Sequence, residues 1–70
     1  MAQVKVYYDR IGNTLTVWFG DPQSEYVGEE TGDEVVLMKD KNGRVIGFEK
    51  LNFSVVAQDQ LNVAFEALAA

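Results

Sequence analysis

Apolar and polar residues alternate along two stretches near the start of the chain, residues 3–9 and 14–19. This period of two is typical of a β-strand with one buried face. Gly12–Asn13 lies between the stretches and tolerates a positive φ, so the sequence predicts a β-hairpin. Pairing Tyr8 with Leu15 brings the apolar side chains of both strands to one face. The pairs on that face are Val4 with Phe19, Val6 with Val17, and Tyr8 with Leu15.

The stretch after this hairpin ends its second strand. Pro22 has no amide hydrogen for a strand ladder, and Gly20–Asp21 favours a turn. Residues 24–30 are ambiguous, because Tyr26 and Val27 could form a short edge strand. The glutamates of this stretch would suit an edge, where charge discourages further pairing.

The centre of the chain carries a second hairpin signal, two apolar runs separated by residues 40–44 with the sequence DKNGR. A two-residue loop of Asn42–Gly43 would form a type I′ turn. Such a loop would set two like charges against each other, which is unfavourable. Its pairs would be Lys41 with Arg44 and Leu37 with Phe48.

A three-residue loop, residues 41–43, instead pairs Asp40 with Arg44, an opposite-charge pair worth about 0.2–1 kcal/mol. Gly43 then takes the left-handed position, which suits a residue without a Cβ. We therefore predict the three-residue loop. Its further pairs, Met38 with Ile46 and Val36 with Phe48, place four apolar side chains on one face.

The last segment of the chain has the spacing of an amphipathic helix, with apolar residues at i, i+3, i+4 and i+7. These residues are Leu61, Ala64, Phe65 and Leu68. Ser54 and Asp59 both qualify as N-caps. A helix of about 10–15 residues does not persist alone in water, so we expect it to dock on the sheet.

The predicted fold is α+β, one small domain over residues 1–70. An antiparallel β-meander of four or five strands covers residues 3–51, and one C-terminal helix at about 55–69 packs on one face. The expected docking face consists of Val4, Val6, Val17, Phe19, Val36, Met38, Ile46 and Phe48.

Composition limits what can stabilise such a small domain. The 70 residues include no cysteine and no histidine, which excludes disulfides and an ordinary structural zinc site. A chain of this size buries only about 60% of its unfolded surface. Packing, helped by self-association, therefore has to supply the stability, and we expect a homodimer or other homo-oligomer.

Charge narrows the classes of partner. The net charge is −5 and the isoelectric point about 4.4. Such a surface repels phosphates, which argues against a nucleic-acid role and fits a basic protein partner. No apolar run is long enough to span a membrane, and the start lacks the apolar region of a signal peptide. We therefore expect a cytoplasmic protein with no membrane partner.

An acidic connector, residues 21–34, carries all its charges as carboxylates. They are Asp21, Glu25, Glu29, Glu30, Asp33 and Glu34. A solvated surface that protects the sheet edge is the first interpretation, and a contact for a basic partner is the second. The third is a metal- or small-molecule-binding regulatory domain, although the spacing matches no EF-hand loop.

Catalytic signals are weak. Ser24 and Ser54 have no histidine that could act as their base, and no glycine run matches a phosphate-binding loop. The paired acids, Glu29–Glu30 and Asp33–Glu34, are neighbours only in sequence. We predict no catalytic residue, no metal ligand and no cofactor, and hence a protein that is not an enzyme.

Two aromatic side chains, Tyr7 and Trp18, fall on the face of the first hairpin opposite the apolar one. Lys5 lies opposite Trp18, where a cation–π contact is geometrically feasible. Neighbouring polar side chains or a loop could simply cover these rings. An interface is the alternative, because aromatic residues are enriched at interface centres. The candidate interface residues are Tyr7, Trp18, Glu29 and Glu30.

The order of these pieces resembles a small bacterial family, domain of unknown function 2283. The segments that carry the resemblance are VYYDRIGNTLTVWF and EVVLMKDKNGRVIGFEKLN, separated by the acidic connector. They cover residues 4 to about 54, and the C-terminal helix predicted here is longer than in many members. The resemblance implies a strand meander that ends in a short helix, with no activity or site residues to transfer. Some members resemble partners of small toxin-like proteins.

Together these observations predict a non-enzymatic protein-interaction module. The acidic surface and the family resemblance favour an antitoxin-like role or one accessory to a basic partner. The alternative is the regulatory domain that would use the acidic connector to bind a metal or a small molecule.

Overall fold

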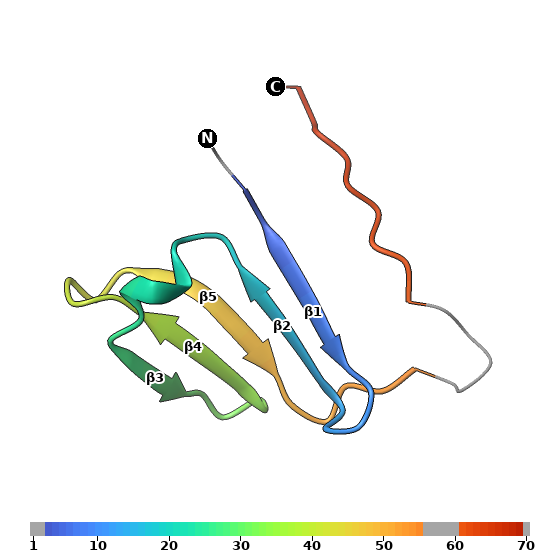
Figure 1. Cartoon of the computed structure of the whole chain (residues 1–70), viewed down its shortest axis with the longest axis horizontal. Coiled ribbons are helices and arrows are strands. Elements are labelled where there is room, and N and C mark those ends of the chain that lie inside the picture. Colours follow the sequence, from blue (N-terminus) through green and yellow to red (C-terminus); the bar gives the residue numbers. More distant parts are fainter. Residues whose placement is uncertain (1–2, 56–60, 70) are drawn as a thin grey trace.

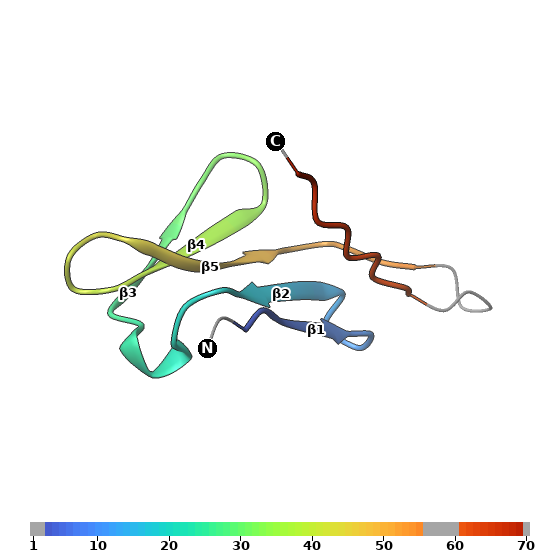
Figure 2. The same ribbon diagram turned by 90° about the horizontal axis from the view of Figure 1, so that it is seen from above.

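Five antiparallel strands form one sheet in the order β1-β2-β5-β4-β3 (Figure 1). The computed structural model describes residues 3–55 and 61–69. The elements are β1 (Lys5–Asp9), β2 (Thr14–Trp18), the 3-10 turn η1 (Pro22–Ser24), β3 (Val27–Glu30), β4 (Val35–Lys39) and β5 (Val45–Lys50). Seen from above, the strands form a single twisted layer (Figure 2). Within the described ranges, η1 is the only helical segment.

The first hairpin has the predicted register. Tyr8 lies opposite Leu15, and Val6 lies opposite Val17. The ladder ends at Lys5, one residue short of the predicted pair that involves Val4. Three features build the turn: Asp9 Oδ1 accepts hydrogen bonds from the amides of Ile11 (2.9 Å) and Gly12 (3.0 Å), and Asn13 has a φ of 55°.

The segment between β2 and β3 crosses one end of the sheet, since β3 lies at the far edge from β1 (Figure 1). Asp21 begins η1 by accepting a hydrogen bond from the Gln23 amide at 2.9 Å, and Pro22 occupies the first helical turn. The amide of Tyr26 then donates to the carbonyl of Lys39 at 2.8 Å. The short edge strand allowed by the sequence is therefore present as β3.

The second hairpin has the predicted three-residue loop. The amide of Asp40 donates to the carbonyl of Arg44 at 3.0 Å, and Gly43 has a φ of 78°. Asp40 Oδ1 also accepts hydrogen bonds from the amides of Asn42 (2.9 Å) and Arg44 (3.0 Å). One carboxylate thus holds the loop together from inside.

The pairs predicted beyond this turn are wrong, because β5 contains one extra residue, Ile46, opposite the junction of Met38 and Lys39. The observed pairs are Lys39 with Val45, Met38 with Gly47, Leu37 with Phe48, and Val36 with Glu49. The carbonyl of Ile46 instead accepts hydrogen bonds from the amides of Phe19 (2.9 Å) and Gly20 (2.8 Å). This β-bulge therefore ties β5 to the end of β2.

The bulge decides which residues share a face. We call one side the valine face; its central row runs through Val6, Val17, Phe48 and Leu37. The flanking residues on this face are Tyr8, Leu15, Val27, Glu29, Val35, Lys39, Val45 and Lys50. The other side, the tryptophan face, holds Lys5, Tyr7, Asp9, Thr14, Thr16, Trp18, Gly28, Glu30, Val36, Met38, Gly47 and Glu49. The expected docking face is thus split, because Val36 and Met38 lie with Trp18.

The buried apolar core is small. Among the described residues, only Met38 (5% exposed) and Ile46 (6% exposed) are buried hydrophobic side chains. Ile46 lies close to Gly20, where an added Cβ would come within 2.7 Å of the isoleucine Cβ. Gly47 is also buried, and the other strand residues are half-buried or exposed, as expected for a sheet with no second layer.

The predicted C-terminal helix is contradicted, so the described chain is an antiparallel sheet rather than an α+β fold. Residues 61–69 contain no helix, and Phe65 and Leu68 are 85% and 91% exposed. The Val55 amide donates to the Tyr8 hydroxyl at 2.9 Å, which holds the preceding chain at the end of the first hairpin. A helical stripe with no docking contact lacks the burial that stabilises a short helix. The predicted cap Asp59 lies outside the described residues.

Candidate functional site

Tyr7 and Trp18 lie on the tryptophan face, as the alternation predicts. Tyr7 is 55% exposed on the edge strand β1, whereas Trp18 is half-buried on β2. The register sets Lys5 opposite Trp18. The indole also lies against Gly47, where an added Cβ would be 2.8 Å from Cε3. The Trp18 side chain therefore packs against the face of the sheet, whereas the Tyr7 side chain remains exposed and accessible to a partner.

Glu29 and Glu30 lie on β3, the opposite edge strand. Neighbouring strand residues point to opposite faces, so Glu29 belongs to the valine face and Glu30 to the tryptophan face. Glu29 forms an ion pair with Lys39, with an Nζ–Oε2 distance of 2.6 Å. Three strands separate β3 from Tyr7 on β1, about 19 Å at the usual strand spacing. The structure does not gather the four candidate residues into one site.

The acidic connector is exposed, and some of its carboxylates have structural partners. Asp21 caps η1, and Glu34 binds both Lys50 (3.4 Å) and the Asn52 side-chain amide (3.0 Å). In the described ranges, no group of three or more acidic side chains is placed to hold a metal ion. The connector thus has the geometry of a solvated surface with local structural contacts.

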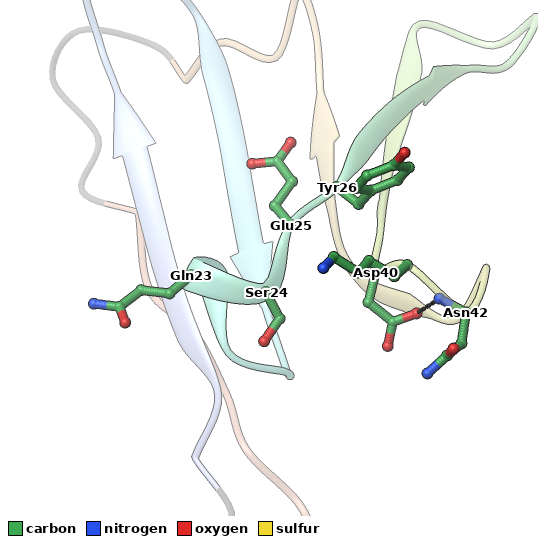
Figure 3. A pocket seen from close by; sticks show the side chains of 7 residues that line it. Gln23, Ser24, Glu25, Tyr26, Asp40 and Asn42 are labelled. Atoms are coloured by element: carbon green, nitrogen blue, oxygen red, sulfur yellow. Dashed lines mark hydrogen bonds between the residues drawn. The ribbon is translucent and has the colours of Figure 1, made fainter.

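A shallow hollow lies where the crossing segment meets the β4–β5 turn (Figure 3). It has a volume of about 400 Å³. Its lining is Gln23, Ser24, Glu25, Tyr26, Asp40, Lys41 and Asn42. Of these residues, Asp40 is half-buried and the others are exposed. Asp40 Oδ1 is already used by the turn, and Ser24 has no histidine to activate it, since the chain contains none. The hollow offers polar contacts rather than a catalytic arrangement.

Sequence reasoning missed the hollow, because it depends on two segments that are distant in the chain. A second hollow of about 350 Å³ adjoins it and shares Ser24 and Asp40. Phe19 and Ile46 contribute apolar surface there. The local sequence features near these hollows are the turn residues Gly20–Asp21 and the DKNGR loop, and each predicts a turn rather than a hollow.

The valine face is an apolar surface that the described chain leaves partly open. Val6 is 37% exposed and Val27 is 47% exposed, at its two edges. One end of the face is covered, because Phe53 packs edge-on against Tyr8 with ring centroids 5.7 Å apart. The central row from Val6 to Leu37 crosses four strands without a charged residue. Alternation had indicated an apolar face here, but as the dock for a helix that the described residues do not contain.

Comparison with models of protein families gives a match over residues 5–54 to the family described as "Protein of unknown function (DUF2283)". The matched range begins with β1 and extends beyond the end of β5. No curated protein and no solved structure gives a match. In the part of the chain that the structure describes, no helix is long and apolar enough to cross a membrane.

Proposed function

This chain belongs to the DUF2283 family of proteins of unknown function, and we propose that it is a non-enzymatic protein-interaction module that assembles with itself. The observation that carries this proposal is the sheet with two open faces. A single layer cannot bury both faces of its strands, and stable domains place a second layer against such a sheet. A partner chain can provide that layer.

The exposed area of the chain supports self-assembly. The accessible surface is 5795 Å², whereas a compact 7.8 kDa monomer has about 4,400 Å² by the usual scaling with mass. Residues 61–69, all of which are exposed, contribute to the excess of about 1,400 Å². A standard protein–protein interface buries about 800 Å² on each partner. The chain therefore carries enough surplus surface for an interface.

The acidic surface supports a second contact, with a basic protein partner. Glu25, Glu30 and Asp33 are exposed, and the net charge is −5. Opposite charge speeds association and favours a basic partner over an acidic one. This is the arrangement expected of an antitoxin-like or accessory protein. The metal-binding alternative has less support, because the described acids form no cluster.

Sedimentation equilibrium of the whole chain over low to high micromolar concentrations tests self-assembly. We expect a mass that rises to at least twice 7.8 kDa. A monomer across the whole range would contradict the proposal.

The basic partner is tested by pull-down from native lysate at low and high salt. We expect capture of a basic protein at low salt that is lost when ions screen the surface. The matched control carries Glu30→Gln and Asp33→Asn, which keep the side-chain shapes and remove charge. Equal capture by both baits, unaffected by salt, would contradict an acidic contact surface.

A further inference from the structure

We propose that the valine face is covered by the same face of a second copy of this chain, so that two sheets form a β-sandwich about a twofold axis. This inference rests on the proposed self-assembly and specifies its surface. Packed sheets lie about 10 Å apart, with inward side chains from both layers forming the core. A twofold interface uses one patch on both subunits, so the patch must complement itself.

The chemistry of the central row meets that requirement. Val6, Val17, Phe48 and Leu37 lie side by side across four neighbouring strands. Apolar side chains complement any similar apolar surface, and their burial contributes roughly 25 cal/mol per Å². The half-buried state of Val17, Leu37 and Phe48 in the single chain shows that the row has apolar area left to bury.

Charge favours a second copy on this face rather than on the other. The valine face carries two lysines, Lys39 and Lys50, and each is paired with a carboxylate, so these ion pairs add no net charge to the face although the net charge of the chain is −5. The carboxylates are those of Glu29 and Glu34. The tryptophan face carries one lysine and three acids. The lysine and the acids are Lys5, Asp9, Glu30 and Glu49. Two valine faces therefore meet with little like-charge repulsion, whereas two tryptophan faces would bring six carboxylates together.

The ion pair between Glu29 and Lys39 lies beside the apolar row at its β3 end, with side chains 56% and 23% exposed. This position fits the polar rim that surrounds the apolar centre of an interface. The acidic side chains of the tryptophan face would point outward from the sandwich. A basic partner could then bind without displacing the second copy.

Two neighbouring residues of β1 provide a matched test, because Val6 belongs to the valine face and Tyr7 to the opposite one. We expect Val6→Glu to raise the dimer dissociation constant at least about tenfold by sedimentation equilibrium, which corresponds to 1.4 kcal/mol. Tyr7→Glu is expected to leave it within about twofold. Circular dichroism of each variant checks that the strands are retained.

Cysteine labelling keeps the inference testable if Val6→Glu fails to fold. The chain has no cysteine, so Val6→Cys and Tyr7→Cys each introduce a single thiol. At dimer-forming concentration, we expect a maleimide to label the Val6→Cys protein slowly and the Tyr7→Cys protein rapidly. Dilution below the dissociation constant should remove the difference.

Other occupants give different results. Loss of the dimer in Tyr7→Glu, with Val6→Glu unaffected, would overturn the valine face as the interface but not self-assembly. Loss in Phe65→Asp would assign the face to the C-terminal segment of the partner and would also overturn the inference. A monomeric wild-type chain would overturn the proposed self-assembly itself.

Discussion

The indole of Trp18 lies against Gly47, its partner across β2 and β5. A Cβ built on the glycine would be 2.7 Å from the carbonyl oxygen of Val17 and 2.8 Å from Cε3 of the indole. We therefore predict that Gly47→Ala lowers the free energy of unfolding by about 1–3 kcal/mol, since either the ring or the backbone must move. Urea unfolding measures the change. Gly32→Ala is the control, expected within about 0.5 kcal/mol, because no atom lies within 4 Å of its added Cβ.

Gly43 tests a conformational rather than a steric requirement. Its φ is 78°, and nothing lies within 4 Å of the position of an added Cβ. Gly43→Val is expected to lower the free energy of unfolding by about 1–3 kcal/mol, because a β-branched residue is strained at positive φ. Gly43→Asn should cost less, since asparagine tolerates the left-handed region. Equal losses for the two variants in urea unfolding would contradict this explanation.

Asp40 holds the second turn through two backbone amides, those of Asn42 and Arg44. Asp40→Ala removes both hydrogen bonds and should lower the free energy of unfolding by about 1–2 kcal/mol. Asp40→Asn keeps an acceptor oxygen and should recover most of the loss. Thermal unfolding followed by circular dichroism compares them. If Asp40→Asn is as unstable as Asp40→Ala, the carboxylate acts through its charge and not as the acceptor described here.

The Tyr8 hydroxyl anchors the chain after β5 by accepting from the Val55 amide. Tyr8→Phe keeps the edge-on contact with Phe53 and removes only the acceptor. We expect hydrogen exchange at the Val55 amide to accelerate, while the Phe19 amide, which donates to the Ile46 carbonyl within the sheet, keeps its protection. A global rise in exchange would instead show that the hydroxyl stabilises the entire sheet.

Local patterns predict the two hairpins because their causes are local. Alternation alone sets Val6 opposite Val17, since any slip by one residue would move the apolar side chains to the other face. The loop at 40–44 is equally readable: Asp40 supplies the acceptor and Gly43 the positive φ. These features depend on residues no more than a hairpin apart.

The bulge at Ile46 has a distant cause, which the second hairpin does not reveal. The Ile46 carbonyl binds amides at the end of β2, and Gly20 leaves room for the isoleucine side chain. Leu37 consequently pairs with Phe48, as in the rejected two-residue loop, although the turn itself is the three-residue one. The sequence features that could have indicated the bulge are Gly20 and Gly47, which other residues approach closely: Ile46 lies against Gly20, and Trp18 lies against Gly47.

The candidate site was predictable only in part. Alternation places Tyr7 and Trp18 on one face, as observed, but the same rule separates Glu29 from Glu30. The helix prediction was wrong because the apolar spacing at residues 61–69 indicates an amphipathic helix but does not show whether a surface of the sheet packs against it. The valine face is open because no helix of the described residues covers it, and no local sequence pattern predicts this exposure.

Strand order has a consequence for how the molecule assembles. The N-terminal hairpin meets the remaining three strands only along the ladder between β2 and β5. Partners in that ladder, such as Val17 and Phe48, are about thirty positions apart, so this seam closes later than either hairpin in a chain that folds by local contacts first. A nick in the exposed crossing segment near residue 23 would leave two fragments, one with the β1–β2 hairpin and one with the three-strand meander β3-β4-β5, that can reunite along one line of hydrogen bonds.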